Sequence, residues 1–402
     1  MASVLQPGKP EPQRLLVRGV NWLGDAVMTT PALLRLRERF PRAHLALLTA
    51  EKLAPLWSQH PALDALLIRQ AKESNSAVAR RLRTENFDTA VVLPSSIRAA
   101  LEMWLAGIPR RIGYGRRWRN LLLTENVPPR AGRVAMRKRG EREIRRLVGP
   151  TDGGCESSRA PGRPVAPSRM ATAVPPLSHQ VYEYLHLAAA LGANPSPLAP
   201  HLEIGDAESK SAEEKFDLAP ILRNGRAILA LNPGAEYGPA KRWPLERFIT
   251  AAKEVQSRTG CTWLLFGRAQ EYSLCAAIEK GLSSQVAATG KRGSCLGAVR
   301  NLAGETSLRE LMALLKLCRV LLTNDSGPMH VAAALGRPVV VPFGSTNPEL
   351  TGPLCSGTMP HQVLQAHVPC APCFRRVCPI DLRCLAGIAA ERAVAAVLAI
   401  LG

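Results

Sequence analysis

The sequence lacks the features that define several large protein classes. None of its apolar runs reaches the roughly 18 residues that a membrane-spanning helix requires, and residues 1–13 are polar and proline-rich, so we expect no secretory signal. Aromatic residues make up only 4% of the 402 residues, which leaves few side chains on which nucleic-acid bases could stack. No recognised nucleic-acid-binding signature is present. We therefore expect a cytoplasmic protein with no nucleic-acid partner.

Acidic residues are also scarce relative to basic ones. The chain has 52 Lys and Arg against 32 Asp and Glu, a net charge of +20, and much of the excess lies in residues 110–119 and 130–146. Such a charge attracts anionic partners. Two interpretations stay open here: a solvated basic surface, or a patch that meets an anionic glycolipid at the inner face of a membrane.

What is present is enough apolar sequence for two domains. Hydrophobic residues make up 46% of the chain, and candidate strands alternate with helical patterns, which is typical of parallel α/β sheets. The expected strands are residues 15–20, 44–49, 66–69, 89–93, 228–231, 263–266, 320–323 and 339–342. We expect one Rossmann-like domain at 14–204, with a flexible insertion rich in Pro, Gly and Ser at 150–178, and a second at 205–402. The last helix, 388–401, is a candidate to pack back on the first domain.

Residues 323–344 form the most informative segment. An apolar strand ends at Thr323, and a polar turn opens a helix that Asp325 or Ser326 can cap. The free N–H groups and partial positive charge at a helix start suit a phosphate, and Asp325 and His330 would lie beside it. The alternative is that Asp325 only caps the helix and His330 only packs on its surface.

A second phosphate-suited turn spans residues 231–244. Asn232 and Gly234 let the backbone approach a ligand, and Lys241 supplies a positive charge. Parallel sheets bind ligands at the carboxyl ends of their strands, so the two turns together predict a nucleotide diphosphate at one sheet edge.

A third loop follows the first expected strand. Asp25 lies where that strand turns into a helix; it either caps the helix, the simpler interpretation of the residue alone, or places a carboxylate at the mouth of a cleft. Pro31 predicts that the helix kinks there or restarts with Thr30 as its cap.

Ten cysteines in a long chain without an export signal are expected to be thiols. Four of them are clustered with C-x2-C-x4-C-x5-C spacing, namely Cys370, Cys373, Cys378 and Cys384. Four thiolates can hold a structural zinc or an iron–sulfur cluster, but this spacing is not diagnostic, and we favour reduced or redox-sensitive thiols.

These segments together resemble the ADP-heptose:lipopolysaccharide heptosyltransferases, most closely the heptosyltransferase II branch of glycosyltransferase family 9. The resemblance rests on four stretches, which agree in order and spacing along most of residues 14–390: Gly24-Asp25 with Thr30-Pro31-Ala32; 232–235 with 241–244; 323–330 with 342–346; and 370–379. Two departures are Arg383, where the family commonly has histidine, and an insertion at 150–178 longer than expected.

The resemblance implies a GT-B fold, with two Rossmann-like domains facing a cleft, and an inverting transfer of heptose from ADP-heptose to the anionic inner core of lipopolysaccharide. It implies Asp25 as catalytic base, a donor site, and acceptor contacts at Ser95 and Arg98. The implied donor site comprises Asn232, Gly234, Lys241, Glu271, Asp325, Ser326, Gly327 and His330. The scheme requires no metal cofactor, because Lys241 and the helix dipole can neutralise the diphosphate; neither an Asp-x-Asp triplet nor a Walker-type loop is present. Contact with the inner membrane would be peripheral. The alternatives are a transferase with another donor or acceptor, and a non-catalytic anion-binding protein.

Overall fold

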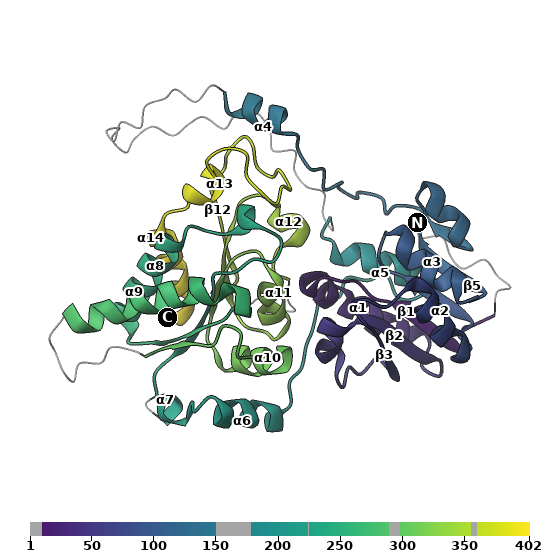
Figure 1. Ribbon diagram of the computed structural model, residues 1–402, viewed down its shortest axis with the longest axis horizontal. Coiled ribbons are helices and arrows are strands. Elements are labelled where there is room, and N and C mark those ends of the chain that lie inside the picture. The colour runs from purple at the N-terminus through teal and green to yellow at the C-terminus, as the bar shows by residue number, and fades with distance from the viewer. Residues whose placement is uncertain (1–9, 150–177, 224, 289–297, 355–359) are drawn as a thin grey trace.

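The computed structural model describes residues 10–149, 178–223, 225–288, 298–354 and 360–402. The expected insertion at 150–178 lies outside these residues except for Ser178. Each half of the described chain contains a parallel sheet of six strands, and the two halves lie side by side (Figure 1).

The first half is built on the sheet β3-β2-β1-β4-β5-β6. Its strands are β1 (Arg14–Arg18), β2 (His44–Ala50), β3 (Ala65–Arg69), β4 (Thr89–Val92), β5 (Arg110–Tyr114) and β6 (Glu125–Val127). Its helices are α1 (Leu23–Arg39), α2 (Asn75–Thr84), α3 (Ile97–Leu105), α4 (Glu141–Val148) and α5 (Val181–Ala189), with 3₁₀ turns η1 (Glu51–Trp57) and η2 (Arg117–Leu122). Apolar residues on both faces of the central strands explain why helices cover both sides of this sheet.

The second half repeats the arrangement with the sheet β12-β11-β10-β7-β8-β9. Its strands are β7 (Ile228–Asn232), β8 (Thr262–Leu265), β9 (Val299–Asn301), β10 (Leu321–Thr323), β11 (Val339–Phe343) and β12 (Gln362–Gln365). Its helices are α6 (Asp206–Lys215), α7 (Ala219–Arg223), α8 (Leu245–Thr259), α9 (Tyr272–Ala288), α10 (Leu308–Leu317), α11 (Gly327–Ala334), α12 (Pro348–Thr351), α13 (Arg383–Ala386) and α14 (Ala390–Leu401), with turns η3 (Pro239–Lys241) and η4 (Ala269–Glu271).

Both sheets have the strand order of a Rossmann fold, counted from the start of each half. The order reverses between β1 and β4 in the first sheet and between β7 and β10 in the second. Ligands bind beyond the carboxyl ends of the strands at such a reversal. The loops that follow β1, β7 and β10 therefore occupy the two ligand-binding positions of the molecule.

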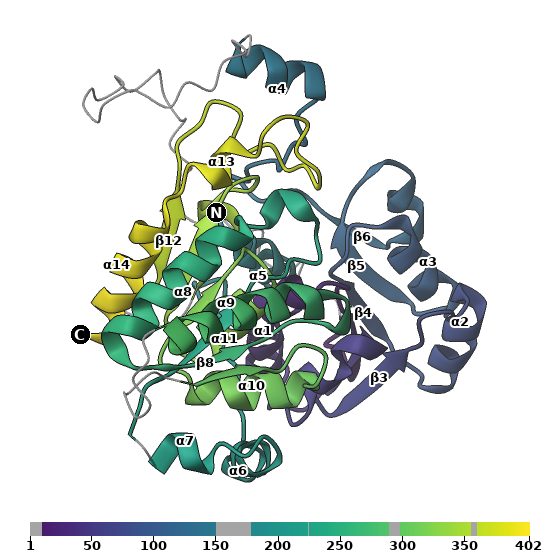
Figure 2. The ribbon, with the colours of Figure 1, turned by 60° about the vertical axis from the view of Figure 1, so that its left-hand side comes forward.

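The two halves share a continuous apolar core. The cluster that contains Leu15 and Val17 of β1 also contains Ile228 of β7 and Val341 of β11, because α1 packs against α11 and η1 packs against α10 between the sheets. A second contact between the halves lies at α4, where Ile144 packs against Cys370 and Cys373 of the second half (Figures 1 and 2). This contact fixes α4 beside the cysteine-bearing segment.

Two local expectations are corrected. The last helix, α14, packs against α8, β11 and β12 of the second half and not on the first domain, because its apolar face completes the core around Trp263 and Leu385. Helix α1 continues through Pro31 without restarting. Proline cannot donate to the Val27 carbonyl, but the Thr30 hydroxyl donates to that carbonyl at 2.9 Å instead.

Candidate active site

A cleft of about 750 Å³ lies between the two halves, at the carboxyl ends of β1, β7 and β10. Asp25, Asn232, Gly234, Lys241, Glu271, Asp325, Ser326, Gly327 and His330 all line it. The structure thus brings the expected base and the expected donor residues into one site.

Asp25 lies in the first turn of α1 and does not cap it, since Trp22 occupies the cap position. Its Oδ1 accepts a hydrogen bond from Nε2 of Gln180 at 3.2 Å. Burial raises the pKa of Asp25 to about 6, against the opposing effects of Lys241 and the Gln180 hydrogen bond. The group is therefore a stronger base than an ordinary aspartate, yet is mostly ionised at neutral pH.

Asp25 faces a charged pair that belongs to the second half. Lys241 Nζ lies 2.6 Å from Asp325 Oδ2, and the hydroxyl of Thr346 donates to the same carboxylate oxygen at 2.5 Å. Asp325 is nearly fully buried, and Ser326 rather than Asp325 holds the cap position of α11, although its side chain makes no capping hydrogen bond. The cap interpretation of Asp325 was therefore wrong.

The loops after β7 and β10 are joined by Asn324, which sequence reasoning missed. Its Nδ2 donates to the Pro233 carbonyl at 2.7 Å, and its Oδ1 accepts from the Trp243 N–H at 2.9 Å. Asn232 donates to Ser326 at 3.3 Å. These bonds hold the lysine-bearing turn against the start of α11.

Gly234 and Glu271 are matched in space. A Cβ on Gly234 would lie 2.4 Å from the Glu271 carboxylate, so only glycine allows this approach. The carboxylate accepts from the Arg268 N–H at 3.0 Å and also pairs with the Arg268 side chain. Glu271 therefore presents a fixed acceptor at the edge of the cleft.

His330 is buried against the N-terminal turn of α1. A Cβ on Gly24 would lie 2.6 Å from His330 Cδ2, and burial lowers the pKa of His330 to about 4. The imidazole is therefore neutral at physiological pH. His330 is buried and lines the cleft, so it does not merely pack on the surface of its helix.

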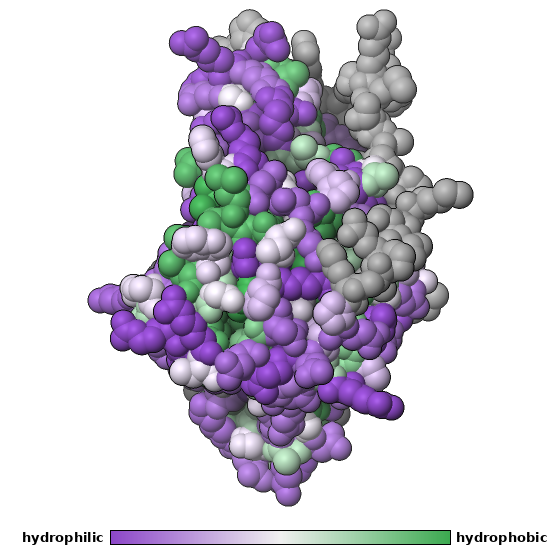
Figure 3. Space-filling view, turned by 90° about the vertical axis from the view of Figure 1, so that its right-hand side faces the viewer, coloured by the Kyte–Doolittle hydropathy of each residue, from purple (hydrophilic) through white to green (hydrophobic). Residues whose placement is uncertain are grey.

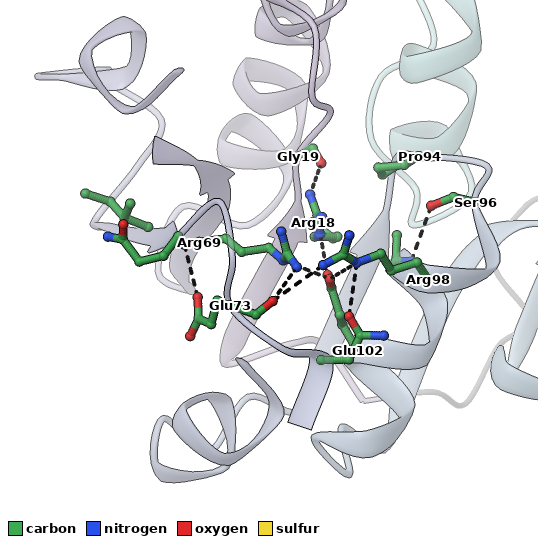
Figure 4. Close-up of polar contacts among 12 residues, drawn as sticks. Arg18, Gly19, Arg69, Glu73, Pro94, Ser96, Arg98 and Glu102 are labelled. Atoms are coloured by element: carbon green, nitrogen blue, oxygen red, sulfur yellow. Dashed lines mark hydrogen bonds and ion pairs between the residues drawn. The ribbon is translucent and has the colours of Figure 1, made fainter. Parts of the chain in front are cut away.

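The predicted acceptor residues do not line this cleft. Ser95 is exposed, and Ser96 rather than Ser95 caps α3 by accepting from the Ala99 N–H at 3.3 Å. Arg98 is half-exposed and lies 3.6 Å from Oε1 of the fully buried Glu102. Figure 4 shows Arg18 and Arg69 converging on the same carboxylate, at 2.7 and 3.0 Å. Three guanidiniums around one carboxylate leave positive charge at the carboxyl edge of the first sheet.

The clustered cysteines support the lysine-bearing turn. Cys370, Cys373, Cys378 and Cys384 line one small cavity with Ser345, and the neighbouring Arg376 carbonyl accepts from the Ala240 N–H at 3.0 Å. Within the described parts of the chain, no group of three or more His, Cys, Asp or Glu side chains is arranged to hold a metal ion. Burial and the three neighbouring thiols raise the pKa of Cys384 to about 12.

Several cleft residues were not predicted as site residues from the sequence. Gln180, Trp22, Tyr237 and Arg376 all line it. The Arg376 guanidinium stacks over the Trp22 and Tyr237 rings at 5.7 and 5.2 Å, which joins the loop after β1 to the cysteine segment. These interacting residues are far apart in the sequence, so no local sequence pattern predicts their contacts.

Two Rossmann-like sheets with a carboxylate on one side of a cleft and phosphate-suited loops on the other define a glycosyltransferase of the GT-B type. The model of glycosyltransferase family 9 (heptosyltransferase) matches residues 149–383, and the chain belongs to that family.

Its relatives agree. The chain is 30% identical over 354 residues to lipopolysaccharide heptosyltransferase 2 of Escherichia coli, and 29% identical over 347 residues to the protein of that name from Salmonella typhimurium, with 85% of each chain covered in both cases. The solved structure of E. coli ADP-heptose LPS heptosyltransferase II superposes with a TM-score of 0.70 at 27% identity, covering 96% of this chain and 98% of that one. A family 9 structure from Veillonella parvula, at 23% identity and a TM-score of 0.71, shares the fold over 97% of each chain.

Proposed function

We propose that this protein is an inverting heptosyltransferase, which moves heptose from an ADP-heptose donor to the heptosylated inner core of lipopolysaccharide. The relatives named heptosyltransferase 2 support the substrate class. The observation that carries the mechanism is the placement of Asp25 across the cleft from the Lys241–Asp325 pair.

In this mechanism the acceptor hydroxyl attacks the anomeric carbon from the face opposite the diphosphate. Its proton passes to Asp25 as the new C–O bond forms, and the bond to the diphosphate oxygen breaks with its electron pair. General-base help of this kind is worth on the order of 10²–10⁴ in rate. The site thereby converts a weakly nucleophilic alcohol into an effective one.

The departing diphosphate needs positive charge. Lys241 and the N–H groups at the start of α11 would supply it without a metal ion. Asn232, Gly234 and Ser326 would line the phosphate path, while Asp325 and His330 would hold the sugar and Glu271 the ribose hydroxyls. The positive charge that stabilises the diphosphate would thus be in place before the diphosphate departs.

We assign the anionic acceptor to the first half, at Ser95 and Arg98. The positive charge that Arg18, Arg69 and Arg98 leave around Glu102 supports this assignment, since guanidiniums bind carboxylate and phosphate groups well. Ser95 and Arg98 follow β4 at the same sheet edge as Asp25, so an acceptor held there would extend its hydroxyl into the cleft.

Contact with the membrane would be peripheral. No helix among the described residues is long and apolar enough to cross a bilayer. Large apolar side chains are nevertheless exposed on α3 and η2, which pack together; they are Ile97, Trp104, Trp118 and Leu121. Figure 3 faces this half and shows hydrophobic side chains gathered among hydrophilic ones. Arg116 and Arg117 are exposed beside them, a combination that suits an anionic lipid surface.

The deciding experiment is a donor panel. Purified wild-type protein should transfer heptose from ADP-heptose to a core lipid that lacks the second heptose, and other nucleotide sugars should react at least 100-fold more slowly. Asp25→Asn should lose at least 10³-fold in kcat while ADP affinity changes less than threefold, and wild-type kcat/KM should fall below about pH 6 as Asp25 protonates.

Each alternative has its own outcome in that panel. Faster transfer from another nucleotide sugar would identify a different transferase. ADP binding without transfer from any donor would favour the non-catalytic anion-binding protein.

A further inference from the structure

Gln180 stands beside the proposed base without belonging to any recognised motif. It precedes α5, and its amide nitrogen uses both hydrogens: one bond runs to Asp25 Oδ1 at 3.2 Å and the other to the Tyr184 hydroxyl at 3.0 Å. Two partners on one planar amide fix its orientation. The amide therefore occupies one oxygen of the Asp25 carboxylate and leaves Oδ2 for a substrate proton.

The backbone of Gln180 is held by the other half of the molecule. Its N–H donates to the Leu350 carbonyl of α12 at 2.9 Å. The adjacent His179 is buried, and its Nε2 lies 3.1 Å from the Gly352 carbonyl; its Nδ1 accepts from the Val181 N–H, so Nε2 carries the proton and donates. A residue from the first half is thus positioned by carbonyls of the second half.

We propose that Gln180 is a positioning residue that orients the Asp25 carboxylate for proton abstraction, and that α12 of the other half holds its backbone in place for this role. This inference rests on the proposed function. It adds a link between domain docking and the readiness of the base, which the donor-binding residues do not provide.

The sign of the effect follows from the charges around Asp25. Lys241 on η3 and the Gln180 amide favour the ionised carboxylate, while Asp325 before α11 and the desolvated surroundings disfavour it. Tyr184 on α5 and His330 on α11 are neutral neighbours, because burial raises the pKa of Tyr184 and lowers that of His330. Loss of the amide donor removes a stabiliser of the ionised form, so the acid limb of activity must move to higher pH.

The test compares two variants across pH with heptose transfer as readout. Gln180→Met keeps the length of the side chain and removes the donor; kcat at pH 7 should fall about tenfold, and the acid limb of kcat/KM should rise by about one pH unit. Gln180→Glu places a second carboxylate beside Asp25 and should move the limb further. KM for the donor should stay within twofold in both. Gln365→Met, on the edge strand β12 away from the cleft, is the matched control and should behave as wild type.

The outcomes separate the two proposals. A wild-type protein that transfers no heptose would defeat the proposed function itself. If wild type is active and either folded variant keeps the wild-type acid limb, Gln180 does not position the base. An equal loss of kcat at every pH with an unmoved limb would likewise overturn the proposal, because it would indicate a purely structural role.

Discussion

At the scale of single residues, the cationic side chain of the site, Lys241, is held in a buried ion pair. Lys241 and Asp325 are both largely buried and lie 2.6 Å apart, and the Lys241 ammonium also lies 5.0 Å from the centre of the Tyr237 ring. A buried cation without partners would be costly. The pair therefore holds Lys241 in place beside the cleft, where we propose that a diphosphate would share it.

Replacing Lys241 tests that role. Lys241→Ala should weaken ADP binding about 10–100-fold and lower kcat at least 100-fold, because the leaving group loses its nearest cation. It should also lower the free energy of unfolding by about 2–4 kcal/mol, since the Asp325 carboxylate stays buried without its counter-charge. Calorimetric ADP titration, steady-state kinetics and denaturant unfolding measure the three effects.

Two companion variants sharpen this test. Lys215→Ala removes a lysine that pairs with Glu310 at 2.7 Å on the surface, and it should change stability by less than about 1 kcal/mol. Lys241→Ala combined with Asp325→Asn should regain stability but not activity. Normal ADP binding by Lys241→Ala would remove the lysine from the donor site.

Residues with a local signature were predictable at this scale, and residues with long-range partners were not. Asp25, Lys241 and Asp325 each follow an apolar strand, and the carboxyl ends of parallel strands meet at one edge. Gln180 lies 155 residues from Asp25, and Thr346 reaches Asp325 from the loop that follows β11. Their importance depends on docking between elements, which a linear pattern does not contain.

At the scale of elements, glycines allow the N-terminal ends of α1 and α11 to approach closely. A Cβ on Gly24 of α1 would meet His330 at 2.6 Å, and one on Gly327 of α11 would meet Leu23 at 2.8 Å. Only hydrogen fits between these backbones and side chains. The close approach of α1 and α11 is what sets Asp25 opposite the donor loops.

Gly24→Ala should therefore damage both fold and site. Alanine gains up to about 1 kcal/mol in helix propensity, but the buried His330 must shift, at a cost of about 1–3 kcal/mol. We expect a lower melting temperature and at least tenfold weaker ADP binding. Gly140→Ala is the control, because a Cβ there meets nothing within 4 Å. Equal stability of Gly24→Ala and wild type would show that a Cβ atom fits between the N-terminal ends of α1 and α11.

Eight strands were predictable, including β3 at one edge of the first sheet, and four were not. The eight expected strands are β1 to β4, β7, β8, β10 and β11, each confirmed within one or two residues. The strands that pattern missed are β5, β6, β9 and β12, which lie toward the sheet edges. Buried strands show continuous apolar runs, whereas β5 begins with Arg110 and Arg111 and β6 and β9 have three residues each. Short, half-exposed strands carry too little pattern to detect.

At the scale of the whole molecule, charge and apolar surface coincide on the first half. The net charge of +20 gives a general attraction to anionic surfaces, which salt screens within about 10 Å at 0.1 M. Exposed tryptophan favours the interfacial region of a bilayer. The α3–η2 surface also lies on the half that we assign to the acceptor, so docking there would bring a lipid-anchored substrate to the Asp25 side of the cleft.

Vesicle binding tests this surface. The double change Trp118→Ser and Leu121→Ser removes side chains that are 70% and 73% exposed. It should weaken binding to vesicles of anionic lipid about tenfold or more, because each large apolar side chain contributes about 1.5–3 kcal/mol when buried. Transfer to a detergent-free, deacylated core acceptor should not change.

The matched control changes two exposed side chains of the second half, Tyr272→Ser and Val377→Ser, which are 53% and 62% exposed. It also removes one exposed aromatic and one exposed aliphatic side chain, but this variant should bind vesicles as wild type does. Salt should weaken the binding of wild-type protein to anionic vesicles more than its binding to neutral vesicles, since only the former has an electrostatic part. If both double variants bind anionic vesicles equally well, the α3–η2 surface is not where the protein meets the membrane, and charge alone must account for the attraction.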